Sequence, residues 1–495
     1  RRVLFRSAFM KLGKHIFGVG VMTGISRIFG FVRDMLIARF LGAGRMSDIF
    51  FAAFKLPNLF RDLLGEGALS TVFVPMFTDQ KKDDYFAKNV FSWLVIVLLG
   101  ITIVFEIVMP IIIMILAPGF SDDPGKFELT VLVSRIMFGY VIFVCVAAFL
   151  SAVLNAFSRF ILAAFMPILL NLMLIASLIF AGRYSDIIVL YIISGTVVLS
   201  GIVQSSILWL RIRKKHFGLN LIVPKWTPRI KQLFRRLGVS IFGNGFYQIN
   251  IIIGTLVASF QSGAVSWLYY SDRIVQLPFA IIGLAAGTVL LSSLSNAIAN
   301  KNMRSVYIQQ NSSIRQSLML ILPSVVGLFV LAKPIIKFLF EHGAWTPAST
   351  NAVAAAIMIQ VLALPAMMLS QIYSKTLYAA QDVRTPVKTS IISLIVSSAI
   401  YLGMFSFIGY LAVPLGTVIG GYLKNYLLGR ACKKRDLFRL EPRTIKSAVF
   451  FGLFSVLLGT ALWFVPITNI FSLGLAMLGF GTLYLPIAFL VSKKI

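Results

Sequence analysis

The sequence predicts an all-α integral membrane protein with about fourteen transmembrane helices. Three observations predict it: the low charge content, the regular spacing of long apolar segments, and the uneven distribution of Lys and Arg among the loops. Of the 495 residues, 58% are hydrophobic and 13% are charged, whereas soluble domains carry roughly 25% charged residues. Too little polar surface remains to coat a soluble core of this size, so lipid is expected to be the main solvent.

Fourteen segments have the length of about 20 mostly apolar residues that a membrane-spanning helix needs. They lie near residues 14–40, 48–77, 89–117, 129–156, 161–181, 186–210, 232–258, 265–298, 313–340, 349–379, 387–407, 409–429, 446–466 and 470–491. The second and the eighth segments are long, contain Pro57 and Pro278, and carry charged residues. Function is therefore expected to involve these two segments.

The formal net charge of +29 is explained by basic loops on one side of the membrane rather than by nucleic-acid binding. The loops rich in Lys and Arg are 211–236, 300–315, 380–388 and 430–446. The loops on the opposite side hold almost no Lys or Arg, namely 118–128, 259–264 and 341–348. Because basic loops stay inside, the pattern predicts both termini in the cytoplasm.

Several function classes are excluded by missing motifs. Two distant cysteines, Cys145 and Cys432, predict neither a disulfide framework nor a metal site, and the three histidines are scattered singly. The sequence contains no Ser/His/Asp set, no HExxH motif and no GxxxxGK[ST] loop for ATP. We therefore expect no catalytic residues, no metal, no cofactor and no built-in ATPase.

The domain organisation follows from a weak internal repeat. Residues of the second segment recur in the eighth at an offset of about 220, namely Phe50, Phe51, Pro57 and Gly67 as Tyr269, Tyr270, Pro278 and Gly287. Parallel repeats of this kind occur in transporters with a binding site between the halves, although chance similarity of two apolar helices is the alternative. The division is a non-native leader at 1–9, an N-lobe at 10–215, a C-lobe at 216–431 and a C-terminal helix pair at 432–495.

Charged residues inside the predicted spans mark the candidate site, because each costs about 2.5–3.5 kcal/mol to insert. The first span holds Arg27, Arg33 and Asp34, the second holds Lys55 and Arg61, and the eighth holds Asp272 and Arg273. Arg27 and Asp34 share a helix face, with Arg33 roughly 120° away. Too few carboxylates are expected nearby, and an excess of Arg suits an anion such as a diphosphate. The alternative is packing by ion pairs, Arg27 with Asp34 and Arg273 with Asp272, while Lys55 extends to the surface.

Three motifs resemble the MurJ/MviN lipid II flippases of the multidrug/oligosaccharidyl-lipid/polysaccharide exporter superfamily. They are SRIFGFVRDMLIARFLGAGRMSDIFFAAFKLPNLFRDLLGEGALSTVFVPMF from Ser26 to Phe77, SWLYYSDRIVQLPFAIIGLAAGTVLLSSLS from Ser266 to Ser295, and YAAQDVRTPVK from Tyr378 to Lys388. The resemblance covers the chain from Met10 onward. It implies transfer of undecaprenyl-diphosphate-linked disaccharide-pentapeptide from the cytoplasmic to the periplasmic leaflet of the inner membrane, for peptidoglycan synthesis.

The resemblance also implies an architecture and a set of site residues. Two six-helix lobes would enclose a central cationic cavity, and the last two helices would form a groove for the lipid tail. Head-group binding would fall to Arg27, Arg33, Arg61 and Arg273, with supporting or gating roles for Asp34, Asp48, Glu66, Asp272 and Gln276. Lipid II, membrane lipids and cell-wall synthesis enzymes are the implied partners.

Two departures from the family bear on ion coupling. Gln276 stands where some relatives carry a functional glutamate, and the seventh span has no Asp or Glu, where some relatives bind sodium. We therefore predict no cation site, and the driving force stays open between membrane potential and an unidentified ion.

Rival functions remain open. A flippase for another polyprenyl-linked glycan, or a drug/cation antiporter of the same superfamily, is the nearest alternative. An antiporter would favour membrane-embedded carboxylates over arginines. A membrane-bound glycosyltransferase or polymerase would need a catalytic carboxylate or metal site, and a non-transporting scaffold would leave the arginines in the spans unexplained.

Overall fold

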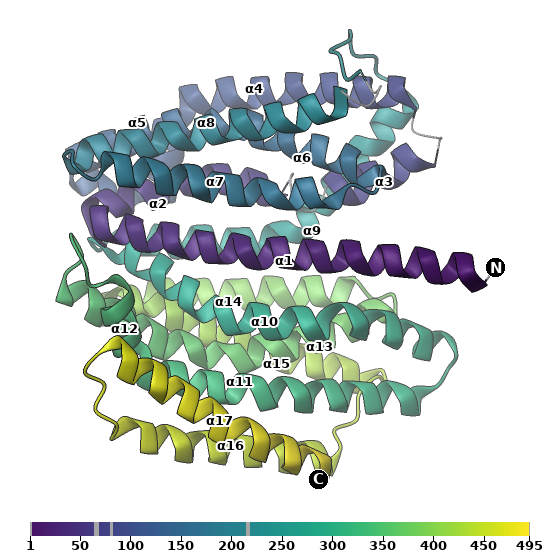
Figure 1. Cartoon of the computed structure of the whole chain (residues 1–495), viewed down its shortest axis with the longest axis vertical. Coiled ribbons are helices and arrows are strands. Elements are labelled where there is room, and N and C mark those ends of the chain that lie inside the picture. Colours follow the sequence, from purple (N-terminus) through teal and green to yellow (C-terminus); the bar gives the residue numbers. More distant parts are fainter. Residues whose placement is uncertain (1, 64–68, 80–82, 214–217, 495) are drawn as a thin grey trace. The chain divides into compact units, whose positions relative to one another are not determined.

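The computed structural model describes residues 2–63, 69–79, 83–213 and 218–494. Within these ranges every regular element is a helix (Figure 1). The first eight are α1 (Arg2–Leu41), α2 (Arg45–Phe60), α3 (Leu69–Thr78), α4 (Asp84–Leu116), α5 (Pro124–Phe138), α6 (Tyr140–Ala156), α7 (Phe160–Ala181) and α8 (Asp186–Arg213). The others are α9 (Pro228–Ala258), α10 (Ala264–Ala299), α11 (Met303–Phe340), α12 (Pro347–Gln360), α13 (Leu364–Ala379), α14 (Arg384–Ile408), α15 (Ala412–Lys434), α16 (Pro442–Trp463) and α17 (Ile470–Lys494).

Each predicted span coincides with one helix or with two consecutive helices, which confirms the all-α membrane fold. The second span comprises α2 and α3, the fourth α5 and α6, and the tenth α12 and α13. Gly139 separates α5 from α6, and a short 3₁₀ turn at Val361–Ala363 separates α12 from α13 just before Pro365. The break before α13 fits the residues present, because proline lacks the amide that continues a helix.

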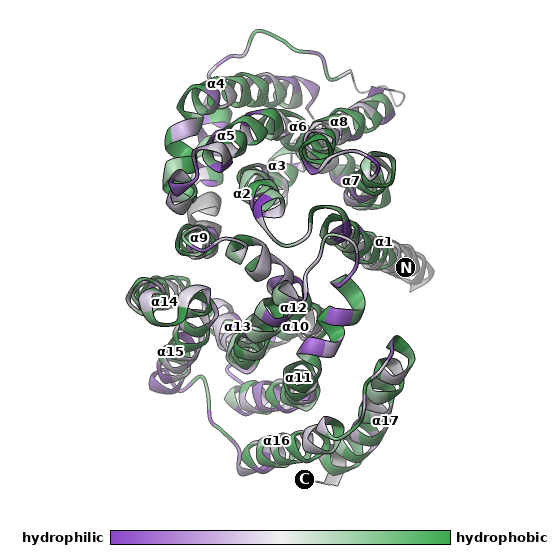
Figure 2. Ribbon diagram, turned by 90° about the vertical axis from the view of Figure 1, so that its left-hand side faces the viewer, coloured by the Kyte–Doolittle hydropathy of each residue, from purple (hydrophilic) through white to green (hydrophobic). Residues whose placement is uncertain are grey.

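Among the described residues, nine helical stretches are long and apolar enough to cross a membrane. They cover ten of the predicted spans, because the stretch Arg384–Lys434 contains both α14 and α15. Figure 2 shows that hydrophobic residues predominate on the helices. The four remaining spans each include residues whose side chains lie outside the described set, so they are not part of this comparison: 14–40, 48–77, 232–258 and 265–298. Three of them, all except 232–258, hold the charged candidate residues.

The chain divides into two compact units, residues 1–249 with 343–345, and residues 250–342 with 346–495. The same internal pairings recur in each unit. In the first, α2–α3 pack on α5–α6, which also contact α4 and α8, and α7 packs on α8. In the second, α10 packs on α12–α13, which also contact α11 and α15, and α14 packs on α15. The second, third, fifth and sixth spans of each half thus have equivalent partners, as the weak sequence repeat predicts.

The boundary between the units lies inside α9, between residues 249 and 250. The segment that precedes α9 packs on the first unit. The Lys225 backbone exchanges hydrogen bonds of 2.9 Å with the Asn89 side chain, and the Ile222 amide donates to Ser92 Oγ at 2.9 Å. Leu219 and Ile230 join the first unit's hydrophobic core. Part of the basic loop at 211–236 is therefore anchored to α4, while the predicted lobe boundary at 215/216 stays a prediction.

Close packing of α8 on α6 depends on Gly201. A Cβ at Gly201 would lie 2.7 Å from Tyr140 Cδ2 and 2.9 Å from Phe143 Cβ. Gly195, on the same helix, is exposed and has no described neighbour within 4 Å of such a Cβ. We predict that Gly201→Ala destabilises the protein by about 1–3 kcal/mol through overpacking, whereas Gly195→Ala is neutral or slightly stabilising. The stability of each variant is measured as its thermal midpoint in detergent, the temperature at which half of the protein is no longer monodisperse after heating. Equal midpoints for both variants would contradict the packing.

Candidate functional site

Arg33 forms a buried polar cluster between α1 and α7. Its Nη2 and Nε donate to Asp34 Oδ1 at 2.6 and 3.0 Å, and its Nη1 donates to Asn171 Oδ1 at 3.0 Å. The Asn171 amide in turn donates to the Ser26 carbonyl at 3.1 Å. The side chains of Arg33 and Asp34 are only 7% and 2% exposed. Such a pair is stable in a low-dielectric interior because each charge has a hydrogen-bonded partner.

The alternative interpretation, an ion pair of Arg27 with Asp34, does not describe the structure, because Asp34 is bound by Arg33. The two neighbours point in different directions from the helix, but the long Arg33 side chain folds back to the carboxylate. Arg27 is exposed, and it has no ion pair or side-chain hydrogen bond among the described residues. An exposed guanidinium on a spanning helix needs water or an anion around it, since lipid tails would not solvate it.

Arg61 lies half-buried at the end of α2 and is also paired with its neighbour. Its Nη2 donates to Asp62 Oδ1 at 3.0 Å, and Asp62 Oδ2 accepts from Gln248 Nε2 of α9 at 3.3 Å. The helix widens into a π turn at Arg61–Leu63, directly after the turn that contains Pro57. The predicted excess of cations in the first unit is therefore smaller than expected, because Asp34 and Asp62 offset two of its arginines.

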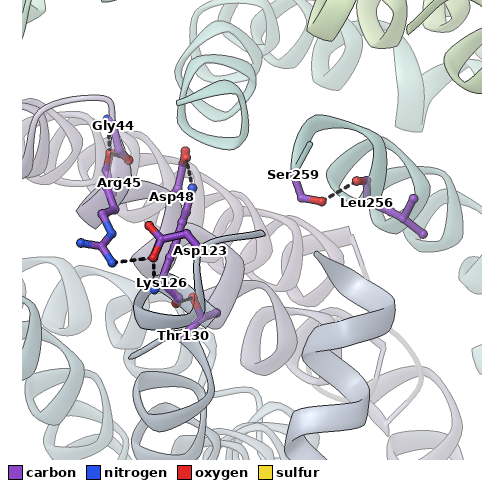
Figure 3. Close-up of polar contacts among 9 residues, drawn as sticks. Gly44, Arg45, Asp48, Asp123, Lys126, Thr130, Leu256 and Ser259 are labelled. Carbon is purple, nitrogen blue, oxygen red and sulfur yellow. Dashed lines mark hydrogen bonds and ion pairs between the residues drawn. The ribbon is translucent and has the colours of Figure 1, made fainter. Parts of the chain in front are cut away.

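Asp48 joins α2 to α5 through a buried ion pair. Asp48 Oδ2 lies 2.9 Å from Lys126 Nζ, and the two side chains are 0% and 7% exposed. Lys126 Nζ also lies 3.9 Å from the centre of the Phe120 ring. One turn away, Arg45 Nη2 donates to Asp123 at 3.0 Å, in a half-exposed pair (Figure 3). The two pairs have reciprocal charges, with Arg45 and Asp48 on α2 facing Asp123 and Lys126, and they fix α2 against the start of α5.

In the second unit, Arg273 of α10 contacts Tyr269, and Asp272 contacts Gln360. Arg273 Nη2 and Nε donate to the Tyr269 hydroxyl at 2.8 and 3.1 Å, and its guanidinium lies 4.9 Å from the same ring. Asp272 accepts from Gln360 Nε2, and Gln360 Oε1 accepts from Ser271 Oγ at 3.1 Å. Gln360 is the last residue of α12, so the break before α13 positions the amide that holds Asp272.

Two predicted residues remain. Gln276 is exposed on α10, and Glu66 lies outside the described residues. Among the described residues, no group of three or more His, Cys, Asp or Glu side chains could hold a metal. Four residues of these clusters were not predicted from the sequence: Asp62, Lys126, Asn171 and Gln360. The Arg-Asp dipeptide at 33–34 recurs at 61–62, and this repetition could have identified Asp62.

The arrangement can bind an anion without chemistry on it. Arg27 offers a planar fork of donors for phosphate oxygens, and Arg273 is oriented through Tyr269 so that part of its guanidinium contacts a phenol. Arg33 and Arg61 are engaged with carboxylates in this conformation and contribute to positioning α1 and α2.

We predict that Lys126→Met destabilises the protein strongly, by about 3–5 kcal/mol, because it leaves the Asp48 carboxylate buried without its ammonium. Arg45→Ala, which breaks the half-exposed pair one turn away, should cost about 1 kcal/mol or less. The double variant Asp48→Asn, Lys126→Met should be less destabilised than the sum of its single variants. Thermal midpoints in detergent measure all four proteins. Equal shifts for Lys126→Met and Arg45→Ala would show that burial of the pair does not matter.

The sequence model of the family described as "Lipid II flippase MurJ" matches residues 37–481. The "Probable lipid II flippase MurJ" of Rhizobium tropici is 34% identical over 506 residues, covering 97% of this chain and 95% of the relative. The "Lipid II flippase MurJ" of Burkholderia cenocepacia is 32% identical over 471 residues, covering 92% and 90%.

Solved structures show the same fold. The structure titled "Lipid II flippase MurJ, inward closed conformation" has a TM-score of 0.81 at 24% identity and covers 96% of this chain and 98% of that chain. An inward-facing MATE family multidrug transporter of the MOP superfamily has a TM-score of 0.67 at 16% identity, covering 83% and 94%. Since the family's sequence model matches most of the chain, this protein belongs to the MurJ family of lipid II flippases, which are transporters.

Proposed function

We propose that this protein transfers lipid II from the cytoplasmic to the periplasmic leaflet of the bacterial inner membrane by alternating access, for peptidoglycan synthesis. The observation that carries the proposal is Arg27, an exposed guanidinium on a membrane-spanning helix whose carboxylate neighbour is already bound by Arg33. Family membership supplies the identity of the anion, an undecaprenyl diphosphate carrying the disaccharide-pentapeptide. No covalent bond is made or broken in this function.

The proposed mechanism separates the two ends of the substrate. The polyprenyl tail stays in lipid, while the charged head crosses among polar side chains that replace its water. Arg27 and Arg273 bind the diphosphate oxygens, since a guanidinium meets them with two parallel hydrogen bonds. Arg33 and Arg61, held by Asp34 and Asp62, keep α1 and α2 in place.

Orientation follows from the charge of the loops. Basic loops on one side support a cytoplasmic location for both termini, and the inside-negative membrane potential acts on any charge that moves. That coupling is worth about 2.3 kcal/mol per charge per 100 mV. An outward-moving anion gains from this potential, which supports membrane potential as the energy source.

The C-terminal helix pair is proposed to hold the lipid tail. On α16 and α17, Leu457, Phe464, Phe471 and Leu475 are exposed, and a Cβ at Gly452, Gly474 or Gly479 would meet no described atom within 4 Å. Gly459 differs, because its Cβ would lie 2.2 Å from Val326 Cγ1, so this glycine serves close packing of α16 on α11. Because lipid already solvates the tail, such a surface orients the substrate more than it adds affinity.

The function is tested in a bacterium depleted of its own flippase. Expression of this chain should restore growth and the periplasmic exposure of labelled lipid II, and growth without that exposure would remove the proposal. In the same assay we predict that Arg27→Ala and Arg273→Ala abolish exposure of the lipid while the thermal midpoint stays near that of the parent protein. Lys at either position should restore little activity, because an ammonium lacks the bidentate fork.

Two controls separate binding from folding. Arg183→Ala, at an exposed position between α7 and α8, should leave transport unchanged. Arg33→Ala should lower the thermal midpoint, since it leaves Asp34 buried without its guanidinium. Full transport by both Arg27→Ala and Arg273→Ala would refute the anion-binding role.

The tail-binding role is tested by crosslinking. We predict that a photoreactive polyprenyl diphosphate labels the segment 442–494, and that Leu457→Asp with Leu475→Asp lowers this label, because carboxylates are poorly tolerated against an apolar tail. Mass spectrometry of the digested protein locates the adducts. Label on other helices and never on α16 or α17 would show that the tail binds elsewhere.

A further inference from the structure

The first unit contains an apolar cavity of about 670 Å³ between the ends of α6 and α8, the start of α7, and α1. Its apolar lining includes Met22, Leu154, Leu162, Phe165, Ile207 and Leu210. Leu154 is part of the buried core of the unit, and Leu162, Phe165 and Ile207 pack against that core. One side of the cavity is therefore formed by the packed core of the unit. Its volume is in the range of binding sites for small molecules.

Two arginines make this cavity amphipathic. Arg159, in the turn between α6 and α7, and Arg211, in the last turn of α8, both line it. Neither forms an ion pair with a carboxylate in the part of the chain that the structure describes. Ser158, also in the lining, adopts a left-handed conformation with φ of 59° that turns the chain sharply between the helices.

The position of the cavity restricts its occupant. α7 and α8 are stretches long and apolar enough to cross a membrane, and α6 is the second half of another, Pro124–Ala156. The two arginines stand at the ends of these helices, Arg159 at the start of α7 and Arg211 in the last turn of α8. The ends of membrane-spanning helices are where lipid phosphates are expected. A ligand with one phosphate and a flexible hydrocarbon chain matches both parts of the cavity.

We propose that this cavity binds an anionic phospholipid of the surrounding bilayer, with its phosphate between Arg159 and Arg211 and one acyl chain against the apolar lining. Basic pockets between spanning helices bind anionic lipid head groups by this combination of charge and burial. The site is separate from the residues proposed to bind the transported substrate. Because Met22 of α1 lines it together with α6, α7 and α8, an occupying lipid bridges α1 to the rest of the unit.

Lipid binding to the purified full-length protein in neutral detergent tests the proposal. Native mass spectrometry would measure retention of phosphatidylglycerol and of phosphatidylcholine with matched chains, and thermal midpoints would be taken with each lipid and with inorganic phosphate. We expect a preference of roughly tenfold or more for phosphatidylglycerol, since each basic residue near the head group attracts it. We also expect phosphatidylglycerol to raise the thermal midpoint. Inorganic phosphate alone should leave the midpoint unchanged, because the acyl chain supplies the buried contact.

Variants assign the preference to this cavity. Arg159→Ala with Arg211→Ala should bind the two lipids equally, while Arg159→Lys with Arg211→Lys should keep most of the preference by retaining both charges. The matched control is Arg213→Ala, two residues further along α8, where the guanidinium lies 5.2 Å from the Trp209 ring. It should retain the preference. The lysine pair keeps the test informative if the alanine pair folds poorly.

Three results would overturn the proposal. They are equal retention of both lipids by the parent protein, an unchanged preference in the Arg159→Ala, Arg211→Ala protein, and stabilisation by inorganic phosphate equal to that by the lipid. None of these measurements depends on transport. A failure of the proposed flippase function would leave them unaffected, and their failure would leave that function intact.

Discussion

The structure depends on one constraint, the high free energy of a charge in a low-dielectric environment. A charged side chain in a spanning helix must find an opposite charge, a hydrogen-bonding group or water. Arg33 and Asp48 are buried and meet this need through Asp34 and Lys126. Arg27 is exposed and has no such partner among the described residues. The same rule thus separates arginines that hold helices together from Arg27, which we propose binds an anionic substrate.

The repeated pairing of spans explains how a transporter can place such residues without losing its core. In each unit the third to sixth spans pack on one another, and they are long and apolar enough to cross a membrane. The charged candidate residues lie on three other spans, namely α1, α2–α3 and α10. These charged residues are therefore concentrated on a few helices, while the apolar spans carry few charges. A bilayer lipid bound between Arg159 and Arg211 would add a contact to α1, which packs along α7.

The sequence by itself determined the helices and their membrane character. In a bilayer the backbone must satisfy its hydrogen bonds internally, so an apolar segment of sufficient length has little choice but to be helical. All fourteen predicted spans coincide with helices for this reason. The motif from Ser26 to Phe77 also located Arg27, Arg33, Asp48 and Arg61 as a group on the first two spans.

Only the tertiary structure decided which charges are neutralised, because their partners come from distant segments or from side-chain conformations. Asn171 reaches Arg33 from 138 residues away, and Lys126 reaches Asp48 from 78 residues away. Helical periodicity placed Asp34 and Arg27 on one helix face, but the guanidinium that binds Asp34 folds back from the adjacent residue, Arg33. Sequence spacing gives the direction of a Cβ atom, whereas the position of a terminal charge depends on several rotatable bonds and on the neighbours that packing brings to it.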